Sequence, residues 1–73
     1  LTHKQIEVLG LIGAGHSNKE IAALLGISIE TVKGHVKDIL ERLNAKNRME
    51  ASIIYRHKQM QQSSHAEPSL HNI

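Results

Sequence analysis

The stretch from Asn18 to Lys37 reads N-K-E-I-A-A-L-L-G-I-S-I-E-T-V-K-G-H-V-K and decides the fold of the chain. Apolar residues recur at helical spacing on both sides of Gly26, and the alternation typical of a strand is absent. Ala22 is small enough to let two helices approach closely, Gly26 tolerates the positive φ of a tight turn, and Val32 can anchor the second helix. This spacing predicts a helix-turn-helix.

Start and stop signals predict two more helices around this stretch. Three capping boxes are predicted, at Thr2-x-x-Gln5, Ser17-x-x-Glu20 and Asn47-x-x-Glu50. In a capping box the side chains of the first and last residues each accept a hydrogen bond from the backbone N–H of the other residue. Ser28 can cap the helix after Gly26, and Asn44 stands where that helix should end.

The apolar faces of these helices predict one small core. They hold Ile6, Leu9 and Ile12 in the first helix, Ile21, Ala22, Leu24 and Leu25 in the second, Val32, Val36, Ile39, Leu40 and Leu43 in the third, and Ala51, Ile54, Tyr55 and Met60 in the fourth. From Gln61 on, the composition turns polar. The sequence therefore predicts an all-α, compact four-helix bundle containing a helix-turn-helix over residues 1–60, followed by a disordered polar tail over residues 61–73.

The composition excludes several classes of protein. The 73 residues suffice for one small domain, and without Cys neither a disulfide framework nor a thiolate metal site can form. No apolar run is long enough to cross a bilayer and no signal-peptide pattern is present, so we expect a cytoplasmic protein without a membrane partner. Because the chain does not begin with Met, we expect it to be part of a longer protein.

Positive charge is concentrated in the second half of the chain. The net charge of the whole chain is +2, whereas residues 33–58 carry seven Lys or Arg and three Asp or Glu. A basic segment of this kind is typical of proteins that bind a polyanion, most simply a nucleic acid.

The third predicted helix turns a polar face outward. At about 100° per residue, Glu30, Gly34, Lys37 and Glu41 lie opposite the apolar stripe, with Lys33 to one side. Lysines suit the O6 and N7 atoms of guanine, or phosphate. Glycine weakens a helix by about 0.8–1 kcal/mol relative to Ala, so Gly34 is either a tolerated imperfection or a gap that lets the backbone approach base edges.

The motifs N-K-E-I-A and T-V-K-x-H, with L-T-x-x-Q-x-E-V-L before them and I-L-x-R-L after them, resemble the LuxR-type (FixJ/NarL-type) DNA-binding domain of bacterial transcription regulators. The resemblance covers residues 1 to about 58. It implies a four-helix domain whose third helix, over residues 29–43, binds in the major groove. It also implies that the domain is the C-terminal output part of a regulator, for which a two-component response regulator is the favoured parent.

The resemblance also implies roles for particular residues. Base contacts are expected from Lys33, Gly34, Lys37 and Glu30. DNA backbone contacts are expected from Asn18, Lys19, Ser28, Thr31, His35, Lys46 and Arg48. Met49, Ile53 and Met60 on the fourth helix form more apolar surface than one small core needs, and the resemblance assigns such a surface to dimerisation. The expected partners are double-stranded DNA, a second copy of the chain on that DNA and, as a further candidate, RNA polymerase.

Two departures from the family pattern are present. His3 and Lys4 replace a common Pro-Arg pair, which leaves the start of the first helix intact. Gly34 stands where members commonly carry Val or another residue able to touch bases, so the target DNA sequence stays open.

Two other functions without catalysis stay open. A sigma-factor-like promoter recognition domain shares the pattern through the third helix, and a protein–protein module would bind through the fourth. No plausible acid–base pair occurs at matched spacing, so we expect no enzyme activity. The six histidines form no i, i+4 pair and have no Cys partners, so we expect no metal site and no cofactor.

Overall fold

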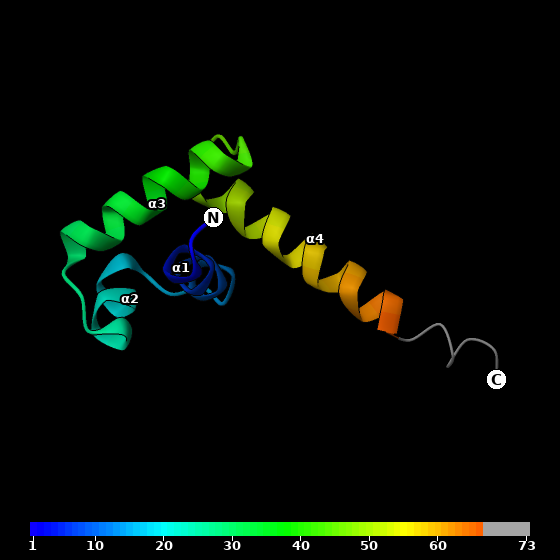
Figure 1. Cartoon of the computed structure of the whole chain (residues 1–73), viewed down its shortest axis with the longest axis horizontal. Helices are drawn as coiled ribbons and strands as arrows, with labels where there is room; N and C mark the ends of the chain where they lie inside the picture. The colour runs from blue at the N-terminus through cyan, green and yellow to red at the C-terminus, as the bar shows by residue number, and fades with distance from the viewer. Residues whose placement is uncertain (67–73) are drawn as a thin grey trace.

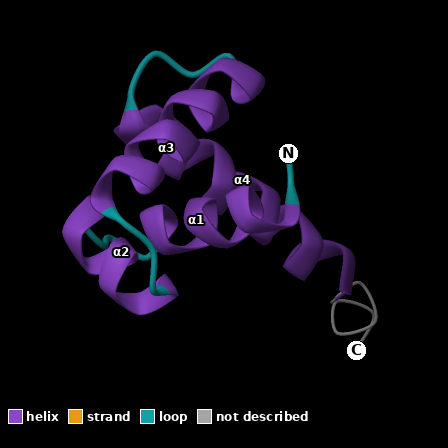
Figure 2. Ribbon diagram, turned by 60° about the vertical axis from the view of Figure 1, so that its left-hand side comes forward, coloured by secondary structure: helices purple, strands orange, loops and turns teal. Residues whose placement is uncertain are grey.

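The structure, a computed structural model, describes residues 1–66 and the side chains of residues 1–60. This part of the chain forms four helices and no strand: α1 His3–Gly13, α2 Asn18–Leu25, α3 Ile29–Leu43 and α4 Arg48–Ala66. Figure 1 shows α1 end-on at the centre, with α2 and α3 on one side of it and α4 running away from it. Figure 2 shows the same helices gathered around α1 from a second direction. The predicted all-α fold is confirmed.

The fourth helix is longer than predicted. We expected it to carry residues as far as Met60, and α4 ends at Ala66. Gln and Ala, which occur in this extension, are good helix formers, so the polar composition that suggested a tail does not itself end a helix. Residues 67–73 of the predicted tail lie outside the described residues. Within residues 1–66, none of the helices combines the length and apolar character that crossing a membrane requires.

The helices begin where their capping residues are. Thr2 Oγ1 accepts from the Gln5 N–H at 3.1 Å while Thr2 N–H donates to Gln5 Oε1 at 3.1 Å, so the first predicted capping box is confirmed. The Ser17 box is formed in the same way. Half of the third box is formed as predicted, because Asn47 Oδ1 accepts from the Glu50 N–H at 2.9 Å. The Glu50 carboxylate differs from the prediction, because it accepts from the Lys46 N–H at 2.9 Å and not from the Asn47 N–H.

Eight hydrophobic residues from the four helices form the buried core. They are Val8, Leu9 and Ile12 of α1, Ile21 and Ala22 of α2, Val32 and Ile39 of α3, and Ala51 of α4. Three predicted members of the apolar faces are exposed: Ile6 at 52%, Leu24 at 59% and Met60 at 67%. Ile6 lies two residues from Val8, and Leu24 two residues from Ala22, which turns each side chain by about 200° from a core residue. Met60 lies beyond Tyr55, the last described residue of α4 that packs against the core.

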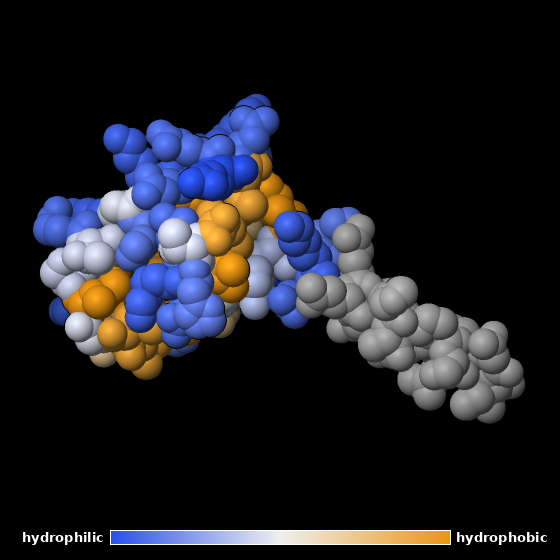
Figure 3. Space-filling view, in the orientation of Figure 1, coloured by the Kyte–Doolittle hydropathy of each residue, from blue (hydrophilic) through white to orange (hydrophobic). Residues whose placement is uncertain are grey.

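Ile6 contributes instead to a surface hollow. This hollow of about 520 Å³ is lined by Leu1, Ile6, Leu9, Arg42, Leu43, Tyr55, Lys58 and Gln59. Figure 3 shows a hydrophobic patch where the start of α1 meets the end of α3 and the start of α4, with hydrophilic side chains around it.

α4 packs against α1 through the ring of Tyr55. A Cβ atom added to Gly13 would lie 2.5 Å from Tyr55 Cδ2 and 3.0 Å from Tyr55 Cε2, and one added to Gly10 would lie 3.4 Å from the Tyr55 hydroxyl oxygen. The ring therefore occupies space that a side chain at Gly13 would need. Only glycine lets the two helices approach this closely.

We predict that Gly13→Ala destabilises the domain. The added methyl group overpacks the contact with Tyr55, which costs about 1–3 kcal/mol and outweighs the small propensity gain at the last residue of a helix. The free energy of unfolding measured in urea should therefore fall.

Gly34→Ala is the matched control, because a Cβ there meets no atom within 4 Å. That variant should gain about 0.8–1 kcal/mol of stability from helix propensity. A Gly13→Ala variant as stable as the wild type would show that the ring of Tyr55 moves aside without cost.

Candidate nucleic-acid interface

α2 and α3 form a helix-turn-helix whose turn depends on short-range contacts. Gly26 ends α2 with φ of 67°, in the left-handed region that favours glycine. The Ile27 N–H donates to the Ala22 carbonyl at 3.0 Å, which closes the end of α2 in the manner of a Schellman motif. Ala22 and Val32 both belong to the buried core, at 6% and 0% exposure. The turn therefore places α3 across α2 with one face of α3 left outside.

The outward face of α3 carries the residues expected to contact bases. Glu30, Lys33, Gly34 and Lys37 are all exposed. A Cβ added to Gly34 would meet nothing within 4 Å, so no packing inside the protein requires a glycine there. Lys33 Nζ lies 3.6 Å from Glu30 Oε1, and both side chains are more than half exposed. An ion pair this exposed contributes little to stability, so it can open when another anion approaches.

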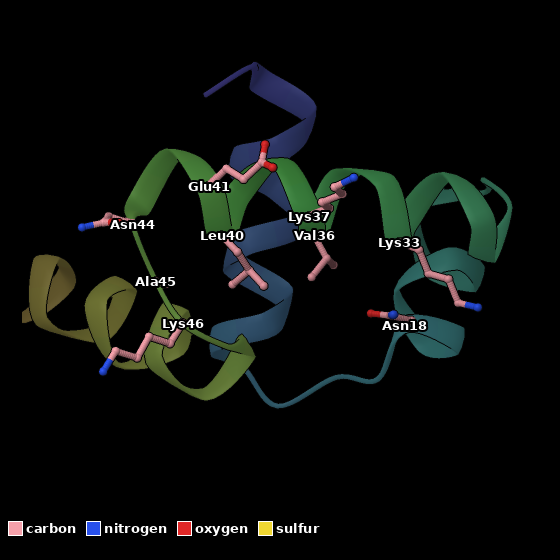
Figure 4. Close-up of a pocket in the computed structure, with 9 residues that line it drawn as sticks. All are labelled: Asn18, Lys33, Val36, Lys37, Leu40, Glu41, Asn44, Ala45 and Lys46. Atoms are coloured by element: carbon pink, nitrogen blue, oxygen red, sulfur yellow. The ribbon is translucent and has the colours of Figure 1, made fainter.

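A groove runs along one side of α3. It has a volume of about 590 Å³ and is lined by Asn18, Lys33, Val36, Lys37, Leu40, Glu41, Asn44, Ala45 and Lys46. Figure 4 shows Val36 and Leu40 pointing into it from α3, with Asn18 and Lys33 at one end and Lys46 at the other. Its lining contains three lysines and one glutamate, so the groove is basic. A basic groove beside an exposed helix face can hold a sugar–phosphate strand while the helix face reaches the bases.

Most of the residues expected to contact the DNA backbone lie at or just before the start of a helix, whereas His35 lies in the middle of α3. Lys19, Ser28, Thr31 and Lys46 are exposed, whereas Asn18, His35 and Arg48 are half-buried. Ser28 and Thr31 stand together at the start of α3, where their hydroxyl oxygens are 2.8 Å apart. The N-terminus of a helix favours an anion, so this placement suits a phosphate.

Arg48 has partners within the protein. Its Nη1 donates to Asn18 Oδ1 and its Nη2 donates to the His16 carbonyl oxygen at 2.5 Å. Arg56, two turns further along α4, donates from Nη2 to the Gly13 carbonyl oxygen at 3.3 Å and from Nε at 3.4 Å. Both arginines therefore bind backbone carbonyls at or just after the end of α1.

Sequence reasoning missed these contacts of Arg48 and Arg56. The carbonyl end of a helix carries partial negative charge and is stabilised by a nearby cation. α1 has no basic residue in its own last turn, so a cation there can come only from another element. The sequence does not say which of the nine Lys and Arg residues would do so.

The residues expected at a dimer contact form an exposed stripe on α4. Met49, Ile53 and Met60 are 73%, 59% and 67% exposed. Their spacing of four and seven residues places them on one face of the helix. The first two also line a shallow groove of about 530 Å³ between α4 and the loop that follows α1.

The first turn of α2 has its own charged contacts. Glu20 Oε1 accepts from the Ser17 backbone N–H at 2.9 Å and lies 3.3 Å from His16 Nδ1. The Ser17 N–H, and after it the His16 ring, hold the pKa of the Glu20 carboxyl below its usual range. A carboxylate at this position also complements the positive end of the helix.

A helix-turn-helix whose outward helix face carries two exposed lysines beside a basic groove is typical of a nucleic-acid-binding domain. The sequence pattern of the family described as "Bacterial regulatory proteins, luxR family" matches residues 1–55. The chain therefore belongs to the luxR family of bacterial regulatory proteins, and the expected resemblance is confirmed. DNA binding in the regulation of transcription is the function of a helix-turn-helix domain of this type.

Several characterised proteins are similar over the same segment. The nitrate/nitrite response regulator protein NarP of Escherichia coli K12 is 42% identical over 55 residues, which cover 75% of this chain and 26% of NarP. A nitrate/nitrite response regulator homologue of Haemophilus influenzae is 46% identical over 55 residues, again 75% of this chain and 26% of the homologue. The response regulator protein VraR of Staphylococcus aureus is 47% identical over 53 residues, 73% of this chain and 25% of VraR. The chain thus matches about a quarter of the length of each of these relatives.

We predict that Glu20→Ala destabilises the domain at neutral pH and does so less in acid. A carboxyl whose pKa is lowered by folding adds stability above its unfolded pKa, and that stability is lost as the pH falls through its folded pKa. The difference in unfolding free energy between wild type and variant should therefore shrink as the pH falls below the ordinary range of glutamates. Glu20→Gln is the control, because it keeps an acceptor for the Ser17 N–H without the titratable charge. A difference that stays constant with pH would contradict the prediction.

Proposed function

We propose that this chain binds double-stranded DNA in a sequence-specific manner, as the output domain of a bacterial transcription regulator. The observation that carries the proposal is the outward face of α3, where Lys33 and Lys37 flank the open position at Gly34. NarP and VraR are named response regulators, which supports a two-component response regulator as the parent protein. Such a regulator acts in the bacterial cytoplasm, with its input domain in the remainder of the protein. We also propose RNA polymerase as a protein partner of this domain.

In the proposed complex α3 lies in the major groove. Lys33 and Lys37 donate to O6 and N7 of guanine, and Glu30 accepts from the N4 amino group of cytosine once its ion pair with Lys33 opens. Gly34 lies between the two lysines on the helix surface, and its lack of a side chain lets the backbone of α3 come closer to the base edges.

The groove beside α3 holds one DNA strand through its phosphates. Lys46 and Asn18 stand at opposite ends of this groove, so they contact phosphates that are separated along the strand. Lys19, Ser28, Thr31 and His35 complete the proposed backbone contacts. These contacts fix the position of α3 on the duplex and carry no sequence information themselves.

A second copy of the chain pairs through the exposed stripe of Met49, Ile53 and Met60 on α4. A single helix face buries much less than the roughly 1,600 Å² of a standard interface, so the contact is weak in free solution. When two copies are bound to adjacent half-sites, this contact makes their binding to DNA cooperative.

We predict that the purified domain binds duplex DNA with a strong dependence on salt. The logarithm of the association constant should fall linearly with the logarithm of salt concentration, with a slope of about −0.9 for each phosphate neutralised.

Lys46→Ala should weaken binding to the specific site and to random DNA alike and reduce the magnitude of the slope by about 0.9. Lys37→Ala should weaken binding to the specific site by roughly 1–3 kcal/mol and binding to random DNA much less.

Fluorescence anisotropy on the two duplexes measures these effects, after the specific site has been selected from a random pool. The comparison of Lys37 with Lys46 is matched, because both are exposed lysines lining the same groove. A slope near zero, or no duplex binding at low salt, would refute the proposed function. Equal losses on both duplexes for Lys37→Ala would make Lys37 a phosphate contact.

We predict that Ile53→Asp abolishes cooperative binding of two copies to DNA with two half-sites and leaves binding to a single half-site intact. The charge would be buried at the contact between the two α4 helices, where it has no partner. Ile6→Asp is the control, because Ile6 is similarly exposed, at 52% against 59%, and lies on α1. Unchanged cooperativity in a folded Ile53→Asp variant would place the dimer contact elsewhere.

A further inference from the structure

Arg48 connects the first turn of α4 to the first turn of α2. Its two terminal nitrogens donate to different groups, Nη1 to Asn18 Oδ1 and Nη2 to the His16 carbonyl oxygen. These partners precede Arg48 by 30 and 32 residues, so the contact is tertiary. The guanidinium is planar and rigid, and binding at two points fixes the orientation of both partners.

The contact determines which way the Asn18 amide faces. A guanidinium only donates hydrogen bonds, so the oxygen of the Asn18 amide has to point toward Arg48. The amide nitrogen, which only donates, is then the group left for a ligand. Asn18 lines the basic groove beside α3 at the end where Lys33 lies (Figure 4), and the ligand proposed for that groove is a DNA phosphate.

We propose that Arg48 is a positioning residue for DNA binding, which acts by holding the Asn18 amide and the start of α2 in the orientation that donates to a phosphate. The family resemblance suggested that Arg48 itself contacts the DNA backbone. The geometry favours the indirect role, because both terminal nitrogens are turned toward the protein and the residue is half-buried. This inference rests on the proposed function, since it requires that a DNA strand lie in the groove.

A double-mutant cycle tests the inference on a random-sequence duplex at low salt, where phosphate contacts dominate. Asn18→Ala should weaken binding roughly threefold to tenfold, the range expected for loss of one hydrogen bond. Arg48→Ala should weaken binding by a similar factor, and the double variant should bind no more weakly than either single variant. Two independent phosphate contacts would instead give the product of the two factors, which would overturn the inference.

Arg48→Lys separates the two roles in a second way. The lysine keeps the charge but cannot bond the His16 carbonyl and the Asn18 side chain with a planar fork. A positioning role predicts that Arg48→Lys binds DNA as weakly as Arg48→Ala and that the salt slope stays unchanged in both. Recovery of binding by the lysine, or a slope reduced by about 0.9 in Arg48→Ala, would show direct neutralisation of a phosphate by Arg48.

Arg56→Ala is the matched structural control. Arg56 also reaches from α4 to a carbonyl oxygen near the end of α1, and it has no contact with Asn18 among the described hydrogen bonds. Urea unfolding should show that both arginine variants lose stability, whereas only Arg48→Ala should weaken DNA binding. An equal loss of binding in Arg56→Ala would reduce Arg48 to a general support of the fold. If the wild type bound no duplex at all, the proposed function would fail before the cycle could be measured.

Discussion

The negative end of α1 is the constraint on which the arrangement of the domain depends. Its last carbonyls carry partial negative charge, and its own last turn contains no basic residue. Arg56 of α4 supplies a cation to Gly13, and Arg48 supplies one to His16 just beyond it. Together with the packing of Tyr55 against Gly13, these contacts join α4 to the end of α1 and to the start of α2. Arg48 also bonds Asn18, which lines the groove beside α3, so these contacts lie next to the proposed DNA-binding side of the domain.

The core contacts of α3 and its proposed DNA contacts lie on different faces of the helix. Its inner face contributes Val32 and Ile39, which are fully buried. On its outer face Glu30, Gly34 and Lys37 are exposed. Exposed substitutions in a helix usually change stability by less than about 0.5 kcal/mol, so this outer face can change without loss of the fold. A family built on this fold can thus read many DNA sequences with one core.

Much of the fold could be predicted because its signals are local. The capping boxes at Thr2 and Ser17, and the left-handed positions at Gly26 and Asn44, depend only on neighbouring residues, and the structure contains all of them. Ile6 and Leu24 were misplaced because helical periodicity defines a broad face and does not say which edge of that face a neighbour will cover. α4 continues to Ala66 because polar residues are compatible with an exposed helix.

Only part of the candidate DNA interface could be predicted from the sequence. The outward face of α3 follows from the period of one helix, so the sequence suffices to place Lys33, Gly34 and Lys37 together. It does not suffice for the bonds of Arg48 to Asn18 and His16, because they join segments 30 and 32 residues apart whose relative position depends on the packing of the whole bundle. Helical periodicity therefore identifies which face of α3 is exposed, whereas the contacts that hold Asn18 beside it are known only from the tertiary structure.

The tyrosine on the seam between α1 and α4 also gives the protein a built-in optical reporter. The chain has one Tyr and neither Trp nor Phe, so all of its near-ultraviolet absorbance and intrinsic fluorescence come from Tyr55. That ring lies against Gly13 and close to Gly10, in a contact where a small displacement of α4 changes its surroundings. A spectral change on adding a partner that is itself optically silent would therefore report movement at this one seam, without any attached label.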